Sequence, residues 1–184
     1  MAPSQLGAFA RSDASQATPN LQYHVQPLSL EKFGDPLHAF PAFTASVCNL
    51  RPTSRGHVRL ASHDSYAAPK IAPHYLSTAA DRHTAADAIR ITRGIVAAPA
   101  LAKYQPEEFK PGLAYQTEEE LAQAAGLIGT TIFHPVGTCK MGKREDPMAV
   151  VDSALRVRRL AMIICAAFSA IMTVGELVRS YTVL

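Results

Sequence analysis

The sequence predicts an α+β fold with the composition of an ordinary folded domain. Segments with strand-like alternation come first and segments with helical periodicity follow. The elements therefore occur in blocks and not in the βαβα order of a doubly wound sheet. The length of 184 residues corresponds to about one domain. With 48% hydrophobic residues, the chain has enough apolar surface to offset the entropy lost on folding.

Charge and motif content exclude several classes of function. The net charge is only +3 and no run of like charges stands out, so a nucleic-acid partner is not expected. Cys48, Cys139 and Cys165 are scattered and form no C-x-x-C pair, which argues against a disulfide framework. Neither G-x-G-x-x-G nor G-K-[ST] occurs, so the chain carries neither common nucleotide-phosphate loop. G-x-S-x-G and H-E-x-x-H are also absent, which argues against a hydrolase or zinc peptidase.

Alternation of apolar and polar residues predicts the strands. Residues 21–25 alternate and end before Pro27, which predicts one short strand. Residues 43–50 predict a longer strand, with positions 43, 45 and 47 on one face and 44, 46 and 48 on the other. Residues 51–56 have turn chemistry, and alternation resumes at Val58 and Leu60. We therefore predict a hairpin over 43–60.

Capping signals and apolar stripes predict two helices. The first spans 78–96, where the Thr78 hydroxyl and the Asp81 carboxylate could accept free backbone N–H groups, and it stops before Pro99. The second starts at Thr117, with Glu120 three residues on and an acidic first turn that suits the helix dipole. The first stripe is Ala85, Ala88, Ile89, Thr92, Ile95 and Val96, and the second is Leu121, Ala124, Ala125 and Ile128.

The segment 130–142, T-T-I-F-H-P-V-G-T-C-K-M-G, is the most informative for chemistry. A β-favouring run ends at His134, and Gly137 and Thr138 follow in an irregular loop whose backbone can approach a ligand closely. A histidine there suits proton transfer, because an imidazole pKa of about 6.5 lets it accept or donate near neutral pH. A hydrogen-bonded structural histidine is the alternative. Cys139 is interpreted as a buried, unreactive thiol.

Two other groups of residues have simpler interpretations. Arg51 and Arg55 could contact an anionic cofactor or substrate, but salt bridges or backbone hydrogen bonds around a turn are the commoner use of such residues. His57, His63 and Asp64 lie close in sequence on a strand and the turn after it. They lack a fourth ligand, so we predict no metal site.

Four segments taken together resemble a known family. They are N-L-R-P-T-S-R-G at 49–56, P-H-Y-L-S at 73–77 with Asp81, H-P-V-G-T-C-K-M-G at 134–142, and A-V-V-D-S-A-L-R-V at 149–157. In that order and spacing they resemble the C-terminal, substrate-binding part of the glucose–methanol–choline (GMC) oxidoreductases. Within that family they are most similar to the choline-dehydrogenase-like flavoprotein alcohol dehydrogenases. The resemblance runs from about residue 5 to residue 157.

The resemblance implies an antiparallel sheet flanked by helices that closes over a flavin ring, with the flavin-binding domain largely missing from this chain. The family oxidises alcohols by hydride transfer to FAD. By that likeness His134 takes the hydroxyl proton of a small-molecule alcohol, while Pro135, Gly137 and Thr138 lie beside the cofactor. We expect the chain alone to be inactive, because the missing flavin-binding domain would be its partner.

After Val157 the sequence departs from the family pattern. The family normally continues with an acidic residue near the flavin and then an Asn or second His that partners the catalytic histidine. Here no Asn follows Asn49 and no His follows His134. A shifted reading frame near codon 157 is one explanation. We therefore predict a GMC substrate-binding domain at 1–157 and a divergent apolar tail at 158–184.

The tail bears on location. Residues 160–175 carry no charge, so the stretch 160–178 could adhere to a membrane, although a packed amphipathic segment is the favoured interpretation. The N-terminus shows no secretory signal, and we expect a cytoplasmic protein that could be membrane-associated. The alternative function is a non-catalytic binding or membrane-attached module that keeps the domain fold.

Overall fold

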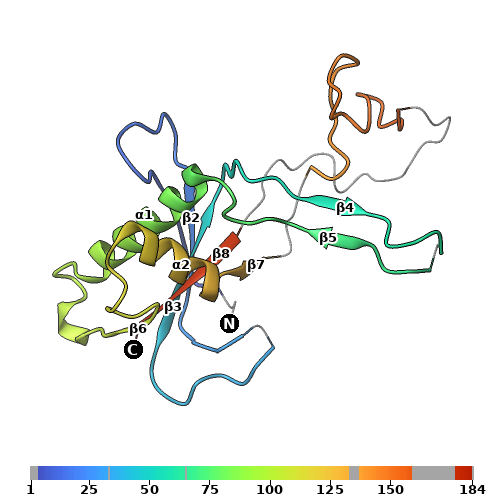
Figure 1. The fold of residues 1–184 in the computed structure, drawn as a ribbon. Coiled ribbons are helices and arrows are strands. Elements are labelled where there is room, and N and C mark those ends of the chain that lie inside the picture. Colours follow the sequence, from blue (N-terminus) through green and yellow to red (C-terminus); the bar gives the residue numbers. More distant parts are fainter. Residues whose placement is uncertain (1–3, 33, 65, 133–136, 159–176, 184) are drawn as a thin grey trace.

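The computed structural model describes residues 4–32, 34–64, 66–132, 137–158 and 177–183. It contains an antiparallel sheet with two helices lying over one of its faces (Figure 1). This arrangement confirms the predicted α+β class and the antiparallel sheet flanked by helices.

Six strands form the main sheet among the described residues, in the order β1-β2-β3-β8-β6, with β7 also paired to β8. They are β1 (Leu6–Ala10), β2 (Leu21–Gln26), β3 (Phe43–Asn49), β6 (Glu108–Lys110), β7 (Thr130–Thr131) and β8 (Leu177–Val183). The strands predicted at 21–25 and 43–50 are confirmed as β2 and β3. They pair antiparallel with Tyr23 opposite Val47.

The predicted hairpin over 43–60 is wrong. A strand does form at β4 (His57–Arg59), but it pairs with β5 (Lys70–Ala72) and not with β3. Both edges of β3 are already occupied, by β2 on one side and β8 on the other, so no free edge remains for β4. Gly56 permits this second pairing, because a Cβ there would lie 2.2 Å from the carbonyl oxygen of Ala72.

Both predicted helices are confirmed, as α1 (Ala79–Val96) and α2 (Glu118–Ile128). The Thr78 side chain caps α1 by accepting from the backbone N–H of Asp81. Thr117 and Glu120 cap α2 with a reciprocal capping box, as their spacing predicts. These local signals succeed because a cap involves groups only three residues apart.

The core lies between the helices and one face of the sheet. Ala45 of β3 packs with Ala85 and Ile89 of α1 and with Leu121 of α2. The Tyr23 hydroxyl reaches α1, where it is hydrogen-bonded to Thr92 at 3.1 Å. The predicted stripes therefore face the sheet along most of their length. Ile95 is an exception, because it is 50% exposed.

The tail is only partly described. Residues 159–176 lie outside the described residues, while 177–183 form β8 beside β3. The division at residue 157 and the membrane role of 160–178 stay predictions. In the part of the chain that the structure describes, no helix combines the length and apolar character needed to cross a bilayer.

One buried carboxylate ties the end of β3 to the start of α1. Asp81 is 3% exposed, and its oxygens accept from the backbone N–H groups of Thr53 and Ser54, each at 2.8 Å. The sequence predicts that this carboxylate caps its own helix, but it binds the 49–56 segment instead. Burial alone would raise the pKa of Asp81, but the hydrogen bonds from Ser54 and Thr53 outweigh it and lower that pKa.

We predict that Asp81→Asn lowers the free energy of unfolding by about 3 kcal/mol at pH 7, because an amide would turn an N–H toward a buried N–H donor. Chemical denaturation measures this loss, and Glu119→Gln on the exposed first turn of α2 is the control. Because the folded-state pKa of Asp81 is lowered, its contribution is present above about pH 4, the unfolded pKa. The contribution is lost as the pH falls through the folded pKa. A difference between variant and parent that stays constant down to pH 2 would contradict this role.

Candidate functional site

The segment predicted to carry the catalytic base begins at β7. Gly129 ends α2, and Thr130 of β7 then pairs with Val178 of β8. His134 and Pro135 fall in 133–136, outside the described residues. Their catalytic and cofactor-binding roles therefore stay predictions.

Gly137 and Thr138 are described, and both are exposed. Gly137 has φ +89°, a conformation that L side chains rarely adopt. Among the described residues, no atom beyond its chain neighbours lies within 4 Å of the place where its Cβ would be. The backbone at Gly137 is therefore open to a flat ligand. This geometry is compatible with the predicted cofactor role of both residues.

Residues 139–158 fold into a compact loop unit that joins two of the predicted motifs. The carbonyl of Lys140 accepts from the N–H groups of Val150 (2.8 Å) and Val151 (3.2 Å). Arg158 closes the unit by donating from its guanidinium to the carbonyl of Gly142 at 2.6 Å. The loop unit, orange in Figure 1, is set apart from the helices. The described part of the first motif, residues 137–142, therefore meets the motif at 149–157.

An ion pair and a tightly fitted glycine shape the loop unit. Lys140 pairs with Asp146 at 2.6 Å, and the hydrogen bond from Lys140 is the largest cause that lowers the pKa of Asp146. Gly142 leaves no space for a side chain, because a Cβ there would lie 2.9 Å from both Ala149 and Asp146. These contacts are structural and leave neither side chain aimed at a ligand.

The arginines of the 49–56 segment support its turn. Arg55 donates to the carbonyls of Pro52 and Ser54, each at 2.9 Å, which is the backbone role favoured for it by the sequence. Arg51 is exposed, and its backbone N–H donates to the Asn49 side chain. Among the described residues, neither guanidinium forms an ion pair with an acidic side chain.

Two of the motif-bearing segments leave the same end of the sheet. Cys48, near the end of β3, lies opposite Val178 of β8, and Thr130 of β7 lies opposite the same residue from the other side. Both β3 and β7 run toward the Leu177 end of β8. The 49–56 segment and the segment leading to His134 therefore start side by side, and this sheet end is the candidate site.

Sequence reasoning missed a polar row on the sheet face turned away from the helices. His24 of β2 pairs in register with Ser46 of β3, while their neighbours Tyr23, Ala45 and Val47 face the helical core. Alternation along the strand puts His24 and Ser46 on the opposite face. The signal was present in L-Q-Y-H-V-Q, where His24 alternates with core residues. Ser46 is only 7% exposed, so this row is partly buried.

His57, considered above for metal binding, contacts a second histidine. The His57 ring lies edge-on to His74, with ring centres 5.1 Å apart. Partial burial, then Arg59 and His74, lower the pKa of His57. Within the described ranges, no group of three or more His, Cys, Asp or Glu converges on a common point.

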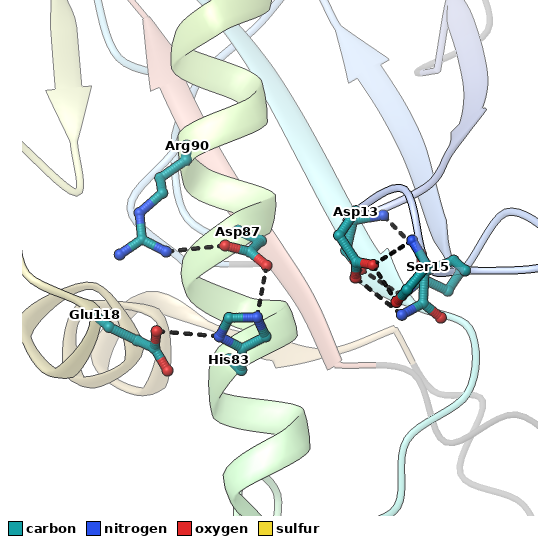
Figure 2. Close-up of polar contacts among 9 residues, drawn as sticks. Asp13, Ser15, His83, Asp87, Arg90 and Glu118 are labelled. Carbon is teal, nitrogen blue, oxygen red and sulfur yellow. Dashed lines mark hydrogen bonds and ion pairs between the residues drawn. The ribbon is translucent and has the colours of Figure 1, made fainter.

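A surface cluster joins the two helices (Figure 2). His83 of α1 contacts Glu118 of α2 through Nδ1 at 3.0 Å and Asp87 through Nε2 at 3.2 Å, while Arg90 pairs with Asp87. The hydrogen bond with Glu118, followed by the charge of Asp87, raises the pKa of His83. Figure 2 also shows Asp13 with Ser15, where hydrogen bonds from Ser15 and its neighbours hold the Asp13 pKa far below its usual range. Both groups are structural contacts on the surface.

One hollow of the described residues lies away from the sheet end of the candidate site. It has a volume of about 660 Å³ and is bordered by Arg93, Val96, Glu108 and Leu113, beside β6. Because Glu108 lies opposite Val183, this hollow sits at the opposite end of β8 from β7. It is therefore not the candidate site.

Comparison with known proteins gives a consistent family. The family model described as "GMC oxidoreductase" matches residues 52–182. An oxygen-dependent choline dehydrogenase of Klebsiella pneumoniae subsp. pneumoniae is 44% identical over 156 residues, which cover 85% of this chain and 28% of that protein. Oxygen-dependent choline dehydrogenase 1 of Chromohalobacter salexigens is 38% identical over 175 residues, covering 94% and 31%.

A solved structure agrees with these relatives. The pyridoxine 4-oxidase from Mesorbium loti is similar with a TM-score of 0.69 and 29% identity, covering 84% of this chain and 30% of that one. The chain therefore spans less than a third of the length of each of these proteins.

We predict that the contact between His83 and Glu118 stabilises the fold in acid and weakens with rising pH. Because the folded-state pKa of His83 is raised, its contribution is complete below about pH 6.5, the unfolded value. The contribution disappears as the pH rises through the folded value. His83 is 53% exposed, so solvent screening limits the effect to about 0.5 kcal/mol. NMR titration of His83 should show a pKa that falls in Glu118→Gln, and an unchanged pKa in that variant would exclude the contact.

Proposed function

This chain belongs to the GMC oxidoreductase family, and from that membership we propose that it forms the substrate side of a flavin-dependent enzyme that oxidises the CH–OH group of a small alcohol. The relatives are named for choline and pyridoxine oxidation, so the alcohol class is the shared feature of their names. The proposal assigns no particular alcohol to this chain.

The observation that carries the proposal is that family motifs pair in space, in two separate places. The motifs around Gly142 and Val151 form one loop unit, and the 49–56 segment leaves the sheet beside β7. His134 follows Thr131 by three residues, so it lies within about 10 Å of β7 along an extended chain. This supports a base positioned near the Leu177 end of β8, from which the 49–56 segment also leaves the sheet.

In the proposed reaction, the His134 imidazole accepts the hydroxyl proton of the alcohol. Loss of that proton weakens the neighbouring C–H bond toward hydride loss, because the developing alkoxide becomes a carbonyl. The alcohol then leaves as an aldehyde or ketone, and the imidazolium returns its proton to solvent.

The residues of this chain fit FAD only as one wall of its site. When bound, FAD supplies the acceptor for the hydride. Gly137, with φ +89° and open space around it, and the exposed Thr138 allow close approach to a flat ring. A phosphate-binding G-x-G-x-x-G loop does not occur in the sequence, so the rest of the cofactor needs residues from another part of the enzyme.

The expected partner of His134 is also not found downstream. No Asn or His follows His134 in the sequence, so a hydrogen-bonding partner must come from another part of the enzyme or the step proceeds without one. We therefore propose that the chain by itself neither retains FAD nor turns over. Mixing it with FAD, an alcohol and a redox dye tests this, and retained yellow colour with dye reduction would overturn it.

The role of His134 is testable in a hybrid enzyme, in which this chain replaces the matching 28% of the Klebsiella pneumoniae relative. We predict that His134→Ala lowers kcat about 10²–10⁴-fold, the usual loss for a general base, without lowering the melting temperature. The acid limb of the kcat/KM profile should disappear in the variant. His83→Ala, on the helix surface, is the control. A variant that melts earlier but keeps its rate per folded molecule would show that His134 is structural.

A further inference from the structure

The β4–β5 hairpin, residues 57–72, is a two-stranded ribbon that Figure 1 shows extending away from the sheet and the helices. Val58 pairs with Ile71 across the ribbon, and Leu60 lies two residues further along the same face. These side chains are 45%, 67% and 86% exposed. The ribbon therefore presents an uncovered aliphatic face.

The other face of the ribbon is cationic. It carries Arg59 and Lys70 beside the polar ring of His57, and Asp64 is the only acidic residue between positions 51 and 74. Antiparallel strands that are aliphatic on one face and charged on the other typically bury the aliphatic face and leave the charged face in water. The pattern indicates contact on the aliphatic face alone.

The base of the ribbon is firmly held. Asp81 anchors the segment that precedes Gly56, and the backbone at Gly56 lies close against Ala72 and Pro73. The ribbon is thus oriented by the same contacts that fix the end of β3. An isolated two-stranded hairpin is marginally stable in water, so cover on its aliphatic face would add to its stability.

The ribbon starts at the sheet end where the candidate site lies. It follows β3 through the 49–56 segment, and the segment leading to His134 leaves β7 at the same end of β8. If His134 faces a flavin, the flavin-binding part of the enzyme must lie at this end as well. About 70% of the length of each relative lies outside the region matched by this chain, which provides a partner of sufficient size.

We propose that the aliphatic face of the β4–β5 ribbon docks this domain onto the flavin-binding part of the enzyme, while the cationic face stays in water. This inference rests on the proposed function. A second copy of the chain fits less well, because three side chains on short strands cover far less than the roughly 800 Å² per partner of a stable dimer.

The hybrid enzyme described above tests the docking surface directly. Val58→Asp with Ile71→Asp should separate the single melting transition of the hybrid into two, and flavin retained after gel filtration should fall at least tenfold. Arg59→Gln with Lys70→Gln, on the opposite face of the same ribbon, is the matched control and should leave both readouts unchanged. In the free chain, the aspartate pair should not lower the melting temperature, because both side chains are already exposed.

Each other outcome has a defined meaning. An unchanged single transition in the aspartate variant, or two transitions in the unmodified hybrid, overturns the docking surface. Binding of the free chain to vesicles of phosphatidylcholine and phosphatidylglycerol that is lost with the aspartate pair also overturns it, in favour of a lipid surface. A dimer of the free chain that dissociates with the pair favours a second copy instead. A hybrid whose docking behaves as predicted but whose His134→Ala variant keeps full turnover contradicts the proposed function alone.

Discussion

The arrangement of the candidate site depends on the buried carboxylate of Asp81. A charge at 3% exposure is stable only because it is fully hydrogen-bonded, here by the backbone of Thr53 and Ser54. Thr78 adds to the connection by capping α1 and by sharing a hydrogen bond with Thr53 at 2.6 Å. Because these bonds join α1 to the segment after β3, the direction of that segment is set by the helix.

These hydrogen bonds hold the end of the sheet at which β3 finishes, and two chain segments leave the sheet at that end. The 49–56 segment leaves beside the segment that leads from β7 to His134. A general base needs a position reproducible to a fraction of an ångström, and rigid elements provide that better than free loops. The role of the fold in the proposed chemistry is therefore to fix where both segments leave the sheet.

Local signals predicted structure well and non-local pairing poorly. The caps at Thr78 and Thr117 were correct because donor and acceptor lie within one helical turn. The strand at 57–59 was correct, but its partner was not, since pairing depends on which edges other strands already occupy. Asp81 was expected to bond within its own helix. The capping pattern at 78–81 is local, so it does not indicate that a distant segment supplies the hydrogen-bond donors. His24 was missed because alternation shows which face of the sheet a residue occupies but not what that face contacts.

This chain carries the proposed proton acceptor but no phosphate-binding loop for the cofactor. His134 and the open backbone at Gly137 suit proton transfer beside a flat ring, yet no phosphate-binding loop occurs in the sequence. Proton and hydride leave the same alcohol, so their acceptors must face each other across it. If the two acceptors belong to different parts of an enzyme, the geometry of the reaction depends on how those parts dock. In the proposed docking the β4–β5 ribbon meets that requirement, because the same Asp81 contacts hold the base of the ribbon and the end of β3.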